Sequence, residues 1–277
     1  YYVPMVDENG GMLNDPVLLK LEENRYWFSI ADSDLLYWIK GLAYGLQLNV
    51  NLREPDVSPL GIQGPKAEDL MAQVIGDEIR DLRFFNFKRF NFNSLELLIA
   101  RSGFSKQGGF EIYVEDFKLG VSIWDTLIEA GANMDVKAGC PNLIERIEAG
   151  LLSYGNDMRN DHTPHQCGLS KFCDTKKAIN CVGRETLLEE IENGPWRQIR
   201  FLEILGKPLN PCRDSWDIRK NNIFVGKVTS AAWSPDFKTN VAIGMIHRDH
   251  WEPGTILLVD TPDGSRELLI KDGPMIE

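Results

Sequence analysis

The last third of the chain consists of short apolar runs at regular intervals, and this pattern restricts the possible folds more than any other feature. From residue 198 onward, Gly, Pro or Asp residues stand between runs that are rich in β-branched residues, aromatic residues and leucine. The runs are RFLEILG, NIFVGKVTS, VAIGMI, TILLVDT and RELLIK. Regular short strands separated by turn residues are typical of a small antiparallel barrel or sandwich. We therefore predict a C-terminal antiparallel β domain over residues 198–277, either a small barrel or a sandwich.

The first two thirds of the chain show a different pattern, in which strand-like and helix-like segments alternate. The predicted strands are residues 17–21, 26–30, 57–63, 83–93, 95–102 and 110–115. The predicted helices are a segment with Ser33 as its N-cap, a segment that begins at Pro65, a segment around Ile123–Ile128, and Asn142–Leu151. This order predicts an α+β fold, with a catalytic region over residues 1–180 and a connector over residues 181–197.

Composition and charge exclude several classes of protein. With 43% hydrophobic and 26% charged residues, the chain has the profile of a folded globular protein. A formal net charge of -11 disfavours a nucleic-acid partner, because an acidic surface repels phosphates. No run of 18 apolar residues occurs, so we expect no membrane-spanning segment. Because the chain begins with Tyr1 and not with Met, we expect that an N-terminal part of the protein is missing from it.

The cysteines and histidines point away from disulfide and metal sites. Five cysteines, an odd number without a CxxC pair, favour free thiols in a reducing cytoplasm. The pairs His162/His165 and His247/His250 have i, i+3 spacing but lack a ligand set of the HExxH kind. We therefore predict a cytoplasmic protein without a metal centre.

Three segments contain residues that suit a ligand site, although each also has a purely structural interpretation. Asp15, in DENGGMLNDP, either completes a turn or faces a ligand. The segment ARSGFSKQGGFEIYVE lacks the phosphate-loop pattern, but its glycines allow close approach of the backbone to a ligand. Glu111, Tyr113 and Glu115 share one strand face there, which periodicity assigns to solvent more readily than to a pocket. Arg146, in CPNLIERIEAGLLSYGND, belongs to a helix whose polar face is ordinarily solvated.

Taken together, these segments resemble the glycine cleavage T-protein family over nearly the whole chain. In chain order, the matching segments are GGMLND, QGP, GFSKQGGFE, RIEAGLLSYGND and a pattern from Ser234 to Thr255. Each motif is weak by itself, but five motifs in order at the family spacing are specific. The resemblance implies a ring-like arrangement of intertwined lobes around tetrahydrofolate, with a small β-barrel as the last lobe.

The resemblance also implies a role for individual residues. Asp15 matches the aspartate beside folate N5, and Tyr2 matches a tyrosine near the same site, so these two are the candidate catalytic residues. Glu111 matches the glutamate that binds the pterin, where its two oxygens can accept paired N–H donors. Arg146 matches an arginine that supports the folate site, and Phe104 takes the place of an aromatic wall. Tetrahydrofolate is thereby implied as the co-substrate, bound by these five residues.

Within the family, the segments YYVPMVDENGGMLNDP, ARSGFSKQGGFEIYVE and CPNLIER resemble the branch that demethylates dimethylsulfoniopropionate. This resemblance implies a sulfonium substrate whose methyl group passes to folate N5. The cationic sulfur needs aromatic faces, for which Phe104 and Tyr113 are the candidates, and the substrate carboxylate needs Lys106 and Gln107. The branch usually has Trp at the position of Phe104 and often Glu at the position of Gln166.

Other functions also stay open at this point. The chain could be an aminomethyltransferase of the glycine cleavage system, a demethylase of another onium or betaine compound, or a non-catalytic folate-binding module. The segments SKQGG and EIYVE favour the sulfonium demethylase, and Asp15, Lys106 and Tyr113 together favour catalysis over binding alone. The expected partners are therefore a small sulfonium substrate and tetrahydrofolate, without a lipoyl carrier protein.

Overall fold

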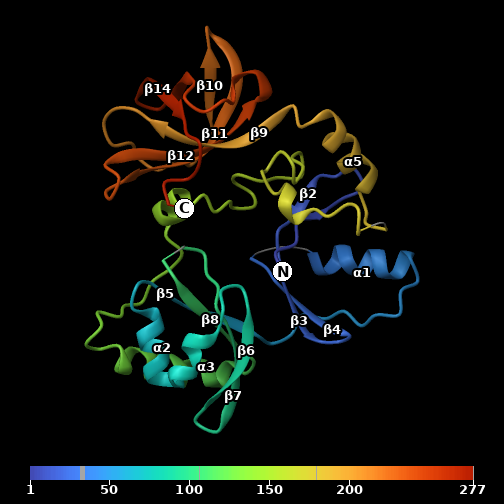
Figure 1. Ribbon diagram of the computed structural model, residues 1–277, viewed down its shortest axis with the longest axis vertical. Coiled ribbons are helices and arrows are strands. Elements are labelled where there is room, and N and C mark those ends of the chain that lie inside the picture. The colour runs from blue at the N-terminus through green and yellow to red at the C-terminus, as the bar shows by residue number, and fades with distance from the viewer. Residues whose placement is uncertain (32–34, 106, 179, 277) are drawn as a thin grey trace. The chain divides into compact units, whose positions relative to one another are not determined.

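The computed structural model describes residues 1–31, 35–105, 107–178 and 180–276, so the predicted N-cap Ser33 lies outside the described residues. The chain forms two compact units, whose elements are labelled in Figure 1. The first unit joins Tyr1–Leu35 to Leu143–Glu277, and the second is Leu36–Asn142.

A closed antiparallel barrel forms the C-terminal part of the first unit (Figure 1). Its strands are β9 (Arg197–Ile204), β10 (Trp216–Lys220), β11 (Ile223–Ser234), β12 (Thr239–His247), β13 (Ile256–Thr261) and β14 (Gly264–Ile270). They follow the order β10-β11-β12-β9-β14-β13, and the barrel closes where β13 pairs with β10. Alternate residues fill the interior, as Leu257 and Val259 of β13 do, because successive side chains of a strand point to opposite faces. The predicted barrel is thereby confirmed.

Strand β10 is the barrel strand that the sequence pattern does not predict. Its sequence, WDIRK, contains three charged residues. Trp216 and Ile218 nevertheless belong to the barrel core, and Arg219 forms an ion pair of 2.7 Å with Asp260 of the neighbouring strand. Pairing with β11 and β13 therefore makes this segment a strand despite its low apolar content.

The remainder of the first unit consists of short elements. They are β1 (Met5–Val6), β2 (Met12–Asn14), β3 (Val17–Glu22), β4 (Arg25–Ser29), α4 (Leu143–Glu148), η2 (Ser170–Phe172), α5 (Arg184–Asn193) and η3 (Arg248–His250). The β3–β4 hairpin lies where the sequence predicts two strands. Helix α5 occupies much of the 181–197 segment that the sequence analysis treats as a connector.

Helix α4 is shorter than predicted. The apolar pattern predicts a helix over 142–151, but the helix ends at Glu148. Gly150 has a φ of 66°, and a Cβ on it would lie 2.7 Å from the ring of Phe201. Ile147 packs against the barrel in a shared core. The left-handed glycine and the close approach to the barrel therefore end the helix.

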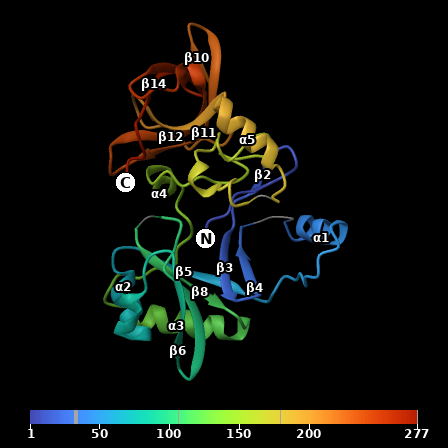
Figure 2. The same cartoon turned by 45° about the vertical axis from the view of Figure 1, so that its right-hand side comes forward.

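The second unit is built around an antiparallel sheet. The sheet has the order β5-β8-β7-β6, from β5 (Ser58–Gln63), β6 (Phe87–Phe92), β7 (Leu95–Ala100) and β8 (Gly109–Val114). Its helices are α1 (Leu35–Gly45), α2 (Ala67–Ile75), η1 (Asp77–Asp81) and α3 (Phe117–Ala130). Apolar side chains of α2 and α3 share one core with the sheet. Figure 2 shows these two helices beside the strands of the sheet. Within the described ranges, no helix has the length and apolar character needed to cross a membrane.

Helix α2 begins later than predicted. The sequence places Pro65 at the first helical position, but the helix begins at Ala67. The backbone N–H of Ala67 donates to the carbonyl of Gly64 (3.0 Å), which closes a turn around Pro65. Gly64 has a φ of 128°, so the chain enters the helix from a conformation that only glycine adopts readily.

Candidate functional site

The turn between β1 and β2 determines the position of the first candidate residues. The Asp7 carboxylate accepts the backbone N–H groups of Asn9 (2.9 Å) and Gly11 (2.8 Å), and it also accepts Nδ2 of Asn160 (2.7 Å). Gly11 approaches Asn160 so closely that a Cβ would lie 2.1 Å from its carbonyl oxygen. The turn that precedes Asp15 is therefore fixed against the segment around residue 160.

We expect Gly11→Ala to lower the free energy of unfolding by about 1–3 kcal/mol, because the added methyl group overpacks this contact. Urea denaturation of the purified protein measures the change. Gly273→Ala is the control in the same unit, where a Cβ has no neighbour within 4 Å. The control is expected to stay within about 0.5 kcal/mol of the parent protein. Equal effects of the two substitutions would contradict the packing argument.

Asp15 and Tyr2 are in direct contact. The phenol Oη of Tyr2 donates a hydrogen bond of 2.5 Å to Oδ2 of Asp15. Tyr2 is itself held by pairing with Val17 and by an edge contact of its ring with Phe172, at 4.7 Å between centroids. Burial raises the pKa of the Asp15 carboxyl, and the hydrogen bond from Tyr2 opposes that shift. Burial and the charge of Asp15 raise the pKa of the Tyr2 phenol, which keeps the phenol a donor.

Asn14, beside Asp15, is a residue that the sequence analysis did not select. It is 3% exposed, and its Oδ1 accepts the backbone N–H of Asp15 (2.9 Å). Its Nδ2 is buried and has no hydrogen-bond partner among the described residues. A buried donor without a partner costs free energy, so this amide is suited to a ligand acceptor. Its place in the same motif as Asp15 is the sequence signal that could have revealed it.

Arg146 lies in a buried ion pair and not on a solvated helix face. Its Nη1 donates to Oδ2 of Asp157 (2.8 Å) and to the carbonyl of Leu151 (3.1 Å), and its Nη2 donates to Oγ of Ser230 (2.7 Å). The Arg146 side chain is 7% exposed and that of Asp157 is fully buried. The other oxygen of Asp157 accepts the hydroxyls of Thr229 (2.6 Å) and Ser230 (2.7 Å). The pair therefore joins α4 and the segment after it to strand β11.

Gln166 also connects elements of the first unit. It is 5% exposed; its Nε2 donates to Glu190 of α5 (3.0 Å), and its Oε1 accepts Nε of Arg197 (2.9 Å). The carbonyl of Gln166 accepts the N–H of Ile199 (2.8 Å). This glutamine therefore connects α5 with β9. The replacement of the glutamate that the branch often has at this position changes a residue of that connection.

In the second unit, Glu111 lies on β8 between β5 and β7. Its carboxylate is half-buried and accepts a hydrogen bond from Oγ of Ser102, a residue that is 7% exposed. Ser102 lies two residues after the end of β7 and begins the glycine-rich segment. The structure thus gives Glu111 a neutral donor partner, which the spacing of the sequence did not predict.

Tyr113 lies on the same face of β8 as Glu111 but is 4% exposed, so the solvated-face interpretation is wrong at this residue. Phe104, in the glycine-rich segment, is 39% exposed. Gln107 is exposed, and its backbone N–H donates to Oγ of Ser105 (3.2 Å). Lys106 lies outside the described residues.

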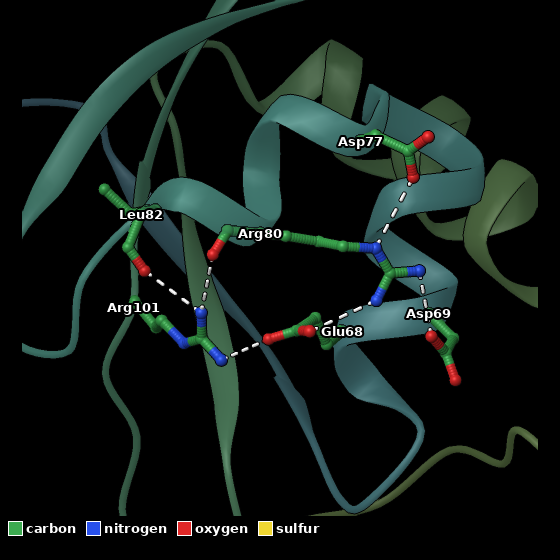
Figure 3. Close-up of polar contacts among 6 residues, drawn as sticks. All are labelled: Glu68, Asp69, Asp77, Arg80, Leu82 and Arg101. Atoms are coloured by element: carbon green, nitrogen blue, oxygen red, sulfur yellow. Dashed lines mark hydrogen bonds and ion pairs between the residues drawn. The ribbon is translucent and has the colours of Figure 1, made fainter.

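Arg101 secures the beginning of the glycine-rich segment (Figure 3). Its guanidinium donates to the carbonyls of Arg80 (3.2 Å) and Leu82 (3.1 Å) and pairs with the Glu68 carboxylate. It also lies over the ring of Phe110, 5.4 Å from the centroid. The Arg80 side chain adds ion pairs to three acidic residues, Glu68, Asp69 and Asp77. The end of β7 is thereby connected to α2 and η1.

The structure brings together two groups of predicted residues, each within one unit. Tyr2 contacts Asp15 in the first unit, and Glu111 shares a strand face with Tyr113 in the second. Arg146 belongs to the first unit, where its side chain donates to Leu151, Asp157 and Ser230. In the described part of the chain, no group of three or more His, Cys, Asp and Glu side chains is arranged to hold a metal ion.

Comparison with known families covers nearly the whole sequence. Residues 1–177 match the GCVT N-terminal domain, and residues 197–276 match the glycine cleavage T-protein C-terminal barrel domain. The chain belongs to the glycine cleavage T-protein family. The second match begins at the first residue of β9, so the family's barrel domain coincides with the observed barrel.

Individual members of the family are similar over the full length of the chain. The dimethylsulfoniopropionate demethylase DmdA of Ruegeria pomeroyi is 54% identical over 273 residues, which cover 99% of this chain and 74% of that protein. An aminomethyltransferase of Caldanaerobacter subterraneus is 27% identical, over 99% of this chain and 71% of that protein. The crystal structure of aminomethyltransferase T from Bartonella henselae covers 100% of this chain and 75% of its own, with a TM-score of 0.82 and 23% identity. This structure shares the fold.

Proposed function

We propose that this protein is a tetrahydrofolate-dependent demethylase of dimethylsulfoniopropionate. The reaction gives 5-methyltetrahydrofolate and methylmercaptopropionate. The observation that carries the proposal is the 54% identity with DmdA of Ruegeria pomeroyi, twice the 27% identity with the aminomethyltransferase of Caldanaerobacter subterraneus.

The chemistry of the described residues fits a reduced folate. Glu111 is a half-buried carboxylate, which suits the paired N–H donors of an aminopyrimidine edge. Asp15 is a carboxylate of raised pKa held by Tyr2, and Asn14 offers a buried amide donor without a partner. We assign the folate to these residues, with Phe104 as an aromatic wall and Arg146 as support. In this proposal residues 1–180 form the folate-binding lobes of the family and residues 198–277 form the barrel domain.

The chemical step makes modest demands on the protein. Bound tetrahydrofolate supplies N5, an amine that takes the methyl carbon as the carbon–sulfur bond breaks. The departing group is a neutral thioether, so a strong base is unnecessary. Asp15 orients N5, stabilises the charge that forms on it, and accepts its proton. Alignment of the three atoms and exclusion of water supply the remaining rate enhancement.

The sulfonium group is assigned to aromatic side chains. A cation over an aromatic face is stabilised by the ring quadrupole, most strongly where water is excluded. Tyr113 is 4% exposed, which provides that exclusion, and Phe104 offers a second ring. Lys106 and Gln107 are assigned to the substrate carboxylate.

The proposal is tested by incubating the purified protein with dimethylsulfoniopropionate and tetrahydrofolate and measuring both products. Stoichiometric formation of methylmercaptopropionate and 5-methyltetrahydrofolate is the expected result. A carrier protein whose lipoyl group bears an aminomethyl group and, separately, glycine betaine are offered in parallel. Turnover with the carrier alone would identify an aminomethyltransferase, and turnover with the betaine alone would identify a different onium substrate. Folate binding without any turnover would identify a non-catalytic module.

Two substitutions on β8 are expected to separate the two ligands. Glu111→Gln should weaken folate binding by about tenfold or more, because one charged acceptor is lost. Tyr113→Leu should raise the KM for dimethylsulfoniopropionate by about thirtyfold, the value of a desolvated cation–π contact. Folate binding is measured by equilibrium titration and KM by product formation.

The controls for these substitutions are at Tyr113 in β8 and at Glu115, which directly follows β8. Tyr113→Phe keeps the ring, so its KM should stay closer to that of the parent protein. Glu115→Gln removes a carboxylate that pairs with Arg89 (2.8 Å), and it should change neither constant. Equal loss of both ligands in Glu111→Gln and Tyr113→Leu would refute the division of the site.

A further inference from the structure

Gln63, the last residue of β5, forms the hydrogen bonds that hold the glycine-rich segment 102–110 together. Its Nε2 donates to the carbonyls of Ser102 (3.1 Å) and Phe110 (3.3 Å). Its Oε1 accepts Oγ of Ser105 (3.0 Å). One carboxamide therefore connects both ends of the segment and its middle.

The space around this carboxamide explains two of the glycines. A Cβ on Gly103 would lie 1.9 Å from Oε1 of Gln63. A Cβ on Gly109 would lie 2.7 Å from Nε2 of Gln63 and 2.2 Å from the carbonyl oxygen of Ile62. The glycine pattern predicts close approach of a ligand, whereas in the structure the Gln63 side chain and its strand occupy the space.

Hydrogen bonds continue from Gln63 to residues that are assigned to the ligands. Ser102, whose carbonyl Gln63 holds, donates its Oγ to Glu111. Ser105, which donates to Gln63, accepts the backbone N–H of Gln107 (3.2 Å). Ser102 and Ser105 are 7% and 6% exposed, so both connections are shielded from competing water. The Gln63 side chain is thus connected by hydrogen bonds, through Ser102 to the Glu111 carboxylate and through Ser105 to the backbone of Gln107.

We propose that Gln63 is a positioning residue. It fixes the orientation of Glu111 through Ser102, and through Ser105 it fixes the conformation of the donor-binding loop, the part of the glycine-rich segment that carries Phe104 and Gln107. This inference rests on the proposed function, in which Glu111 binds the pterin and the loop binds the methyl donor. Gln63 acts through its two serine neighbours and holds them in the productive geometry. A displacement of a binding group by even 1 Å has a large effect on catalysis, which gives such a residue its importance.

Two variants separate the two connections. Q63E keeps an oxygen acceptor for Ser105 but replaces the Nε2 donor, so that a carboxylate oxygen faces the carbonyls of Ser102 and Phe110. We expect Q63E to weaken tetrahydrofolate binding by about tenfold or more, with a smaller rise in the KM for dimethylsulfoniopropionate. S105A removes the hydrogen bond from Ser105 to Gln63 and the one from Gln107 to Ser105, and it keeps the bonds from Gln63 to Ser102 and Phe110. It should raise that KM by about tenfold and leave folate affinity within about twofold.

The control is Q73E, the same change at an exposed position on α2, and it should leave both constants unchanged. Folate dissociation constants, kcat, KM and a thermal melt are measured for every variant. Folate affinity of Q63E equal to that of the parent protein would overturn the proposal. Equal losses of both constants in Q63E and S105A would also overturn it, because general loosening of the unit produces that result.

A further variant keeps the proposal testable if Q63E does not melt cooperatively. Q63M removes all three contacts without adding a charge, and it should lose affinity for both ligands; unchanged constants would overturn the proposal. Failure of the proposed function has a different signature. A parent protein that binds tetrahydrofolate without demethylating dimethylsulfoniopropionate refutes the function, while the folate arm still tests Gln63.

Discussion

Replacement of Arg146 by methionine is expected to lower the free energy of unfolding by about 3–5 kcal/mol, because it leaves the Asp157 carboxylate buried without its charged partner. Asp157 is fully buried, and among the described residues Arg146 is the one cation that forms an ion pair with it. The loss also removes the bond from Arg146 to Ser230, so the contact between α4 and the barrel weakens. Urea denaturation followed by tryptophan fluorescence measures the change.

Arg219→Met is the matched control for this prediction. Arg219 forms an ion pair of similar length with Asp260 (2.7 Å) in the same unit, but the two side chains are 38% and 45% exposed. An exposed pair contributes little, so a change below about 1 kcal/mol is expected. Similar losses in both variants would show that burial of the Arg146 pair does not determine its contribution.

Asp15→Asn is expected to lower kcat for methyl transfer by on the order of 10²–10³-fold, because a neutral amide does not stabilise the charge that forms on N5. Folate affinity should change much less, since asparagine keeps the size and most hydrogen-bonding capacity of aspartate. Single-turnover measurements with saturating substrates isolate the chemical step. A kcat within tenfold of the parent value would remove Asp15 from the reaction.

Tyr2→Phe gives a second test of Asp15, through its pH dependence. Burial raises the pKa of Asp15 and the bond from Tyr2 lowers it, so removal of the hydroxyl should raise this pKa further. If the ionised carboxylate is the active form, activity is lost as the pH falls through that pKa. The acid limb of the kcat profile should therefore move to higher pH in Tyr2→Phe. A limb that stays in place or moves to lower pH would contradict the role of Asp15.

Local features of the site were predictable from the sequence because they depend on neighbouring residues. The turn before Asp15 follows from its glycines, and the structure confirms it with a φ of 77° at Gly10. The alternation of residues 110–115 predicts that Glu111 and Tyr113 share a strand face, and β8 has that arrangement. The family resemblance added roles to these positions, which periodicity alone does not provide.

Periodicity and local motifs do not predict contacts between residues that are far apart in the sequence. Gln63 is 39 positions from Ser102, and Arg146 is 84 positions from Ser230. No helical or strand period relates residues so far apart, so neither the support of Glu111 nor the buried ion pair could be foreseen. The unpredicted strand β10 has the same cause, since its neighbours supply the pairing that its own composition does not indicate.

The sequence by itself determined a C-terminal antiparallel β domain, most of the other strands and helices, and membership of the glycine cleavage T-protein family, because these depend on apolar periodicity, turn residues and local motifs. Only the tertiary structure decided which polar residues are buried and which groups they contact. The sequence pattern predicts that Arg146 and Tyr113 are solvated, whereas in the structure Arg146 forms a buried ion pair and Tyr113 is buried. Burial depends on what packs against a residue, and that information is spread over the whole chain.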